Sequence, residues 1–140
     1  MSFYIFRKQH AQKLPVKQFS EFNVLSLVEV ALGFENDLST KQVNVYAKSK
    51  FNEDQMQQIR YGLEDGISIG KIKIAANPDF APEQMSEIIK GFKNGLSIKK
   101  VKVYADPKFD DDQMRAIRCA FEDGLSIEQV LILADEEFDE

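Results

Sequence analysis

Residues 104–126 read YADPKFDDDQMRAIRCAFEDGLS, and similar stretches occur at 75–97 and 46–68, each 29 residues before the next. A phenylalanine marks every step of this period: Phe22, Phe51, Phe80, Phe109 and Phe138. Self-similarity at a fixed period of about 20 to 50 residues is the signature of repeat proteins, in which each unit packs on its neighbours. The sequence therefore predicts four 29-residue repeats, at 22–50, 51–79, 80–108 and 109–137, before an acidic C-terminal end.

The first half of each repeat has the apolar spacing of an amphipathic helix. Steps of three and then four residues separate Met56, Ile59 and Leu63 in the second repeat. Asn52 and Gln55 form a capping-box pattern at its start, and Gly66 can take a positive φ at its end. We expect a helix at roughly 53–65 and at the equivalent positions of the other repeats. Close helix packing explains the glycines that recur within these helices, Gly33, Gly62 and Gly91.

The second half of each repeat admits two interpretations. A serine suited to an N-cap opens it at Ser39, Ser68, Ser97 and Ser126, which favours a short helix ending near Ala47, Ala76, Ala105 and Ala134. However, Ile72, Lys73 and Ile74 alternate as a strand does, and residues 69–77 match the leucine-rich-repeat consensus. The caps favour an all-α solenoid of four helix-turn-helix repeats. An α/β leucine-rich-repeat-like solenoid is the alternative.

Residues 1–21 fit the period poorly, because Pro15 and Lys17 stand where apolar residues of the repeat would fall. Terminal units of repeat proteins shield the stack from solvent. We therefore expect residues 1–21 to form a degenerate N-terminal cap over the first repeat.

The sequence favours a cytoplasmic location without membrane association. The apolar group at 3–6 precedes Arg7 and Lys8, the reverse of signal-peptide order, and it is too short to span a bilayer. Cys119 is the single cysteine, so no disulfide can form within the chain and a reducing compartment is expected.

No motif indicates catalysis, a cofactor or a metal. The single histidine, His10, lies far in sequence from Cys119, and Tyr61 and Lys90 fill the cysteine's position in other repeats, so we expect Cys119 to be partly exposed. Residues 110–112 form an acidic run without the spacing, glycine or final glutamate of a calcium loop, and helix capping explains them better.

Charge is unevenly distributed around the formal net charge of −5. The third repeat carries six lysines, whereas the fourth carries nine acidic residues and two arginines. Because the sign reverses between neighbouring repeats, direct nucleic-acid binding is disfavoured and another protein is the expected partner. The candidate protein-binding residues are Lys99, Lys100, Lys102, Glu122, Asp123, Glu128 and Asp135.

The segments YADPKF at 104–109, Gln113-Met114, Ile117-Arg118 and GLS at 124–126 resemble a short helical repeat of proteins from Gram-positive bacterial phages and conjugative elements. The likeness covers 22–140 and brings no catalytic activity with it. Its departures are Leu27, Ala31, Ile89 and Glu136. We expect Arg60 and Arg118, which match the pattern, to pair with a carboxylate one turn away, worth about 0.3–0.5 kcal/mol.

These features predict a non-enzymatic protein–protein interaction module, and the resemblance implies an origin in a mobile genetic element. The alternative is an inhibitor of a host defence nuclease, such as a CRISPR or restriction effector. Its acidic surface would then occupy the nuclease's basic nucleic-acid-binding cleft. The oligomeric state stays open at this point.

Overall fold

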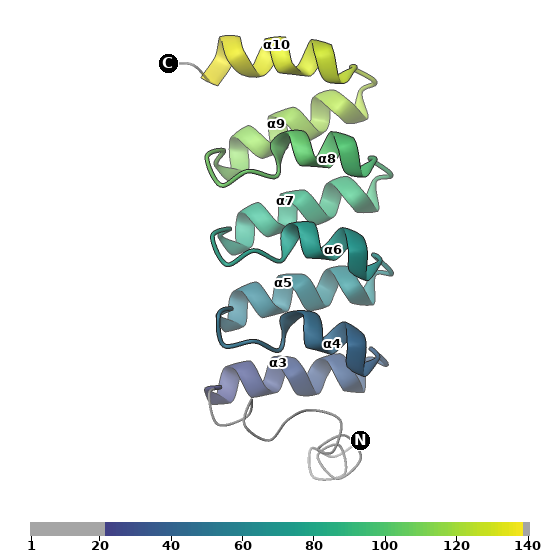
Figure 1. The fold of residues 1–140 in the computed structure, drawn as a ribbon, viewed down its shortest axis with the longest axis vertical. Coiled ribbons are helices and arrows are strands. Elements are labelled where there is room, and N and C mark those ends of the chain that lie inside the picture. The colour runs from purple at the N-terminus through teal and green to yellow at the C-terminus, as the bar shows by residue number, and fades with distance from the viewer. Residues whose placement is uncertain (1–21, 139–140) are drawn as a thin grey trace. The chain divides into compact units, whose positions relative to one another are not determined.

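The computed structural model describes residues 22–138, and every regular element within them is an α-helix (Figure 1). The helices are α3 (Val24–Glu35), α4 (Thr40–Tyr46), α5 (Glu53–Glu64), α6 (Ile69–Ala75), α7 (Pro82–Lys93), α8 (Ile98–Tyr104), α9 (Asp111–Glu122) and α10 (Ile127–Phe138). The all-α prediction is confirmed, and the leucine-rich-repeat-like alternative is wrong. The predicted cap at 1–21 lies outside the described residues.

The chain divides into two compact units, residues 1–78 and 79–140, called unit 1 and unit 2 below. In unit 1, the long helices α3 and α5 pack on each other, and the short helix α4 contacts α3, α5 and α6. In unit 2, the long helices α7 and α9 pack on each other, α8 contacts both, and α10 contacts α9. Each unit therefore contains two helix pairs, with its two long helices packed on each other and its first short helix against both.

The ends of the long helices follow from local sequence. The backbone N–H of Gln55 donates to the Asn52 side chain at 2.8 Å, and the N–H of Asn52 donates back to the Gln55 side chain at 2.9 Å. Pro82 is the first residue of α7, where its missing N–H costs nothing. Positive φ values after the last turn are found at Gly66, Gly95, Gly124 and, in the first repeat, Asp37.

The second half of each repeat is helical because its serine caps are formed. Ser39 and Gln42 make both hydrogen bonds of a capping box, which satisfies two backbone groups at the start of α4. Ile72 is fully buried, and Ile74, which suggested a strand, is half-buried. A short helix in contact with several others buries a wider face than one packed on a single side. This wider buried face accommodates Ile74 in addition to Ile72.

The short helices end one residue earlier than predicted in three repeats, at Tyr46, Ala75 and Tyr104. The following alanine is the C-cap in each case. The last helix differs, because α10 continues to Phe138 and Ala134 lies inside it. Glu136 stands in α10 where the α6 and α8 repeats have Pro78 and Pro107, so no proline interrupts it.

The apolar positions named from the period form the core. Met56, Met85 and Met114 have no exposed surface, and the same is true of Ile59 and Ile88. Burying a side chain of this size contributes about 1.5–3 kcal/mol. These residues hold the long helices in place and thereby position the polar groups described next.

Candidate functional site

A buried carboxylate joins the two long helices of unit 2. Glu87 on α7 is only 2% exposed, and it accepts a hydrogen bond from Nε of Arg118 on α9 at 2.9 Å. Arg118 also donates to Glu122, one turn further along α9, at 2.9 Å. Asn94, the C-cap of α7, donates to the same Glu122 carboxylate at 2.8 Å. Burial of charge is tolerated here because every member of the network has a partner.

Unit 1 contains the same network displaced by 58 residues. Arg60 on α5 donates to Glu29 on α3 and to Glu64 on its own helix, both at 2.8 Å, and Asn36 donates to Glu64 at 2.8 Å. The expected pairing of each arginine with a carboxylate one turn away is thus confirmed. The partner on the neighbouring long helix was missed.

Comparing positions 58 residues apart in the sequence, rather than 29, would have identified Glu29 and Glu87 as these partners. Gln58 and Ala116 occupy the position of the two buried glutamates in the even repeats, and Ala31 and Ile89 occupy the arginine position in the odd repeats. The network therefore has a period of two repeats. In each unit, the first long helix supplies the carboxylate and the second supplies the arginine.

Unit 2 surrounds its buried carboxylate with more positive charge than unit 1. Glu87 has two further cations within reach, Lys90 at 3.3 Å and Arg115 at 3.4 Å, where unit 1 has Leu32 and Gln57. Burial alone would raise the pKa of Glu87. The hydrogen bond from Arg118 and the charges of Arg118 and Lys90 outweigh that effect and hold the pKa below its ordinary value.

A buried tyrosine closes each network from the short helix. Tyr104 donates its hydroxyl to the backbone carbonyl of Glu87 at 2.9 Å, and Tyr46 donates to that of Glu29 at 2.8 Å. A Cβ atom at Gly91 would overlap the Tyr104 hydroxyl, and a Cβ atom at Gly33 would overlap the Tyr46 hydroxyl. The interpretation of these two glycines as sites of close packing is confirmed.

Alkaline titration is expected to ionise the two buried tyrosines only as the helices unfold. Burial raises the pKa of Tyr46 and Tyr104 well above the ordinary value near 10. A raised pKa favours the protonated phenol in the folded state, so this stabilisation is complete below about pH 10 and is lost as the pH rises further. Phenolate absorbance should show a late step that coincides with loss of helical circular dichroism.

A variant with Tyr46→Phe and Tyr104→Phe is the control for this titration, because it retains Tyr4 and Tyr61. It should lack the late absorbance step. Ionisation of all four tyrosines in one reversible step, with the helical signal intact, would contradict the burial argument.

The predicted acidic binding residues separate into paired and unpaired groups. Glu122 is exposed, but its charge is already paired, because it accepts hydrogen bonds from Arg118 and Asn94. Hydrogen bonds from Asn94 and Arg118 and the charge of Arg118 lower its pKa against the opposing effect of burial. Asp123, Glu128 and Asp135 are exposed and form no ion pair within the described residues.

The predicted basic residues lie together on α8, and we call Lys99, Lys100 and Lys102 the lysine surface. Lys99 and Lys102 are exposed and have no ion-pair partner in residues 22–138. Nζ of Lys100 lies 5.8 Å from the centre of the Phe121 ring, within the range of a cation–π contact. Lys90, in contrast, already pairs with Glu87.

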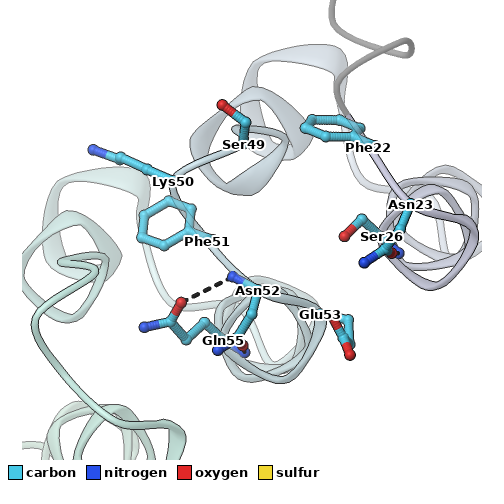
Figure 2. A pocket seen from close by; sticks show the side chains of 9 residues that line it. All are labelled: Phe22, Asn23, Ser26, Ser49, Lys50, Phe51, Asn52, Glu53 and Gln55. Atoms are coloured by element: carbon cyan, nitrogen blue, oxygen red, sulfur yellow. Dashed lines mark hydrogen bonds between the residues drawn. The ribbon is translucent and has the colours of Figure 1, made fainter.

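A cavity of about 320 Å³ lies in unit 1 at the start of α3 and α5, a site that the sequence interpretation missed. Asn23 and Ser26 form one side, and Ser49, Lys50 and Phe51 of the α4–α5 connection form the other (Figure 2). The walls therefore combine hydroxyl, amide and cationic groups with an aromatic ring. The lining of this cavity is therefore mainly polar.

Cys119 is exposed, as its repeat position indicated. No cluster of three or more histidine, cysteine or acidic side chains within residues 22–138 could hold a metal ion. None of the helices described is both long and apolar enough to cross a membrane. Models of protein families, curated proteins and solved structures give no match to this chain.

Proposed function

We propose that this protein is a non-enzymatic protein–protein interaction module that binds an acidic protein partner through the lysine surface of α8. The observation that carries the proposal is the position of three lysines within a seven-residue helix. Lys99 and Lys100 lie in its first turn, where the helix dipole disfavours positive charge. Lys99 and Lys102 are three residues apart, a spacing at which like charges weaken a helix.

The contrast with the rest of unit 2 supports this assignment. The charges of the Glu87 and Arg118 network are paired, and these two residues are buried. The lysine surface adds no such pairing, so an external partner explains it better than the fold does. Opposite charges across an interface mainly increase the rate and specificity of association.

The four-repeat α-solenoid and the cytoplasmic location belong to the same proposal. The packing of two long helices on each other in both units, and a 29-residue period that continues unbroken from 51–79 into 80–108, support the solenoid. A stacked array would offer a partner repeated, similar surfaces and no converging catalytic groups.

A second candidate function rests on the acidic end of unit 2. After Arg118 the sequence contains no lysine or arginine up to residue 140. Asp123, Glu128 and Asp135 are exposed there without ion pairs in the part that the structure describes. A surface of this kind could occupy a basic nucleic-acid-binding cleft. The resemblance to mobile-element repeats suggests that this cleft belongs to a host defence nuclease.

Charge reversal separates the two candidates. Partners isolated with the protein from its native host would be identified by mass spectrometry and then purified for binding measurements. Lys99→Glu with Lys102→Glu should weaken binding at least about tenfold, because like charges then face the acidic partner. Lys41→Glu with Lys73→Glu makes the same charge change on exposed residues of unit 1 and should leave binding unchanged.

The acidic variant combines Asp123→Lys, Glu128→Lys and Asp135→Lys and leaves the structural Glu122 in place. It should retain binding if the lysine surface is the interface. Loss of binding in this variant alone, to a partner with a basic cleft, would replace the first proposal with the second. Full binding by both unit 2 variants would contradict both.

A further inference from the structure

The long helices α5 and α7 each carry a glutamine that hydrogen-bonds to the interhelical connection of the next repeat. In unit 2, Gln84 accepts a hydrogen bond from the backbone N–H of Ala81 at 2.8 Å. Its side-chain amide donates to the carbonyl of Pro107 at 3.3 Å and to that of Phe109 at 2.6 Å. Gln55 in unit 1 makes the corresponding bond to Pro78 at 3.0 Å. The carboxamide thus connects a helix start to the connection one repeat later.

The first repeat has Ser26 in place of this glutamine. Its backbone N–H still donates to the Asn23 side chain at 2.8 Å, so the helix cap is kept. The carbonyls equivalent to those of Pro107 and Phe109 are those of Ser49 and Phe51. No donor within the described residues reaches either of them.

The Ser26 hydroxyl is likewise without a partner in the described part of the chain, although the residue is only 5% exposed. Figure 2 shows this side chain directed into the cavity, across from Lys50 and Phe51. Buried polar groups almost always find a partner, and one left alone costs about 1–3 kcal/mol. Compared with the second and third repeats, this cavity therefore lacks the glutamine carboxamide that hydrogen-bonds to the connection.

We propose that this cavity binds the side-chain carboxamide of a glutamine in an extended segment of a partner protein. The amide nitrogen would donate to the Ser49 and Phe51 carbonyls, as Gln84 does to their equivalents. The amide oxygen would accept from the Ser26 hydroxyl. At about 30 Å³ per water molecule, the cavity has room for roughly ten waters, enough for a side chain and part of its backbone.

A neighbouring apolar strip on α3 favours a protein segment as the occupant. Val24, Leu25 and Val28 are exposed, the first by 75%, where the second repeat has Glu53, Asp54 and Gln57. Exposed apolar groups at positions that are otherwise polar typically mark a contact surface. An extended segment could place its glutamine in the cavity and an apolar neighbour on this strip.

The test uses the full chain labelled with ¹⁵N and the probe N-acetyl-glutamine N-methylamide, followed by NMR. At millimolar probe, the backbone signals of Ser26, Lys50 and Phe51 should shift. The methionine analogue, similar in length but without donors, should cause at least about fivefold smaller shifts. Equal shifts from the two probes would overturn the proposal.

Ser26→Gln supplies the missing carboxamide within the chain. It should abolish the response to the probe and raise the melting temperature, because the orphaned carbonyls gain their donor. A response equal to that of the unchanged protein would count against the proposal. Lys50→Met removes a charged wall residue outside the hydrogen-bond set and should leave the response to the probe within about twofold.

The chain's own Gln9, Gln12 and Gln18 provide the rival occupant. If the unchanged protein is silent and a variant with all three replaced by methionine responds, the cavity is filled from within and a partner segment is excluded. The inference rests on the proposed interaction role only in taking a protein as the occupant. It concerns unit 1, so its failure would leave the lysine-surface test on unit 2 unaffected.

Discussion

Arg60→Met is expected to lower the free energy of unfolding by about 3–5 kcal/mol, the cost of leaving a buried charge without its partner. Glu29 is 8% exposed, and Arg60 is the sole cation paired with it among the described residues. The substitution also releases Glu64, which then keeps only its hydrogen bond from Asn36. Urea unfolding followed by circular dichroism measures the loss.

Arg118→Met is the matched comparison in unit 2, and its cost should be smaller. Glu87 keeps Lys90 and Arg115 as neighbours after Arg118 is removed, whereas Glu29 keeps no cation within ion-pair distance in the described region. An equal or larger effect of Arg118→Met would show that these two cations do not compensate the buried charge.

The double variant Glu29→Met with Arg60→Met distinguishes the cost of losing the ion pair from the cost of leaving the buried Glu29 charge unpaired. It should recover most of the stability lost in Arg60→Met, because no buried charge is then left unpaired. A double variant as unstable as the single one would mean that packing, and not charge, determines the cost.

Gly91→Ala is expected to destabilise the protein by about 2–4 kcal/mol, although alanine is the better helix former. The new methyl group would occupy the position of the Tyr104 hydroxyl. The tyrosine must then move and give up its hydrogen bond to the Glu87 carbonyl, at a site with no exposed surface. Urea unfolding again gives the magnitude.

Gly70→Ala is the control, since it places a methyl group in open space within α6. It should stabilise the protein by about 0.5–1 kcal/mol through helix propensity alone. In a Tyr104→Phe background, the cost of Gly91→Ala should fall, because the overlapping hydroxyl is gone. A cost that stays the same in that background would rule out the hydroxyl as its source.

The candidate site was less accessible from sequence than the fold. The lysine surface was identified from the sequence because a cluster of like charges on one segment is visible in the order of residues. The pairing of Glu122 with Arg118 and Asn94 was only partly visible, since a donor 28 residues away is found by packing. The cavity at Ser26 was not predicted, because its acceptors are backbone carbonyls that every residue possesses.

The sequence alone determined where the helices lie. Caps such as Asn52 with Gln55 and positive-φ residues such as Gly66 act within a few neighbouring residues, so their effect can be read locally. The tertiary structure decided which helices share polar partners. The Glu29 and Arg60 pair depends on two long helices meeting side by side, so the carboxylate and its arginine, 31 residues apart, are recognised as partners only in the folded chain.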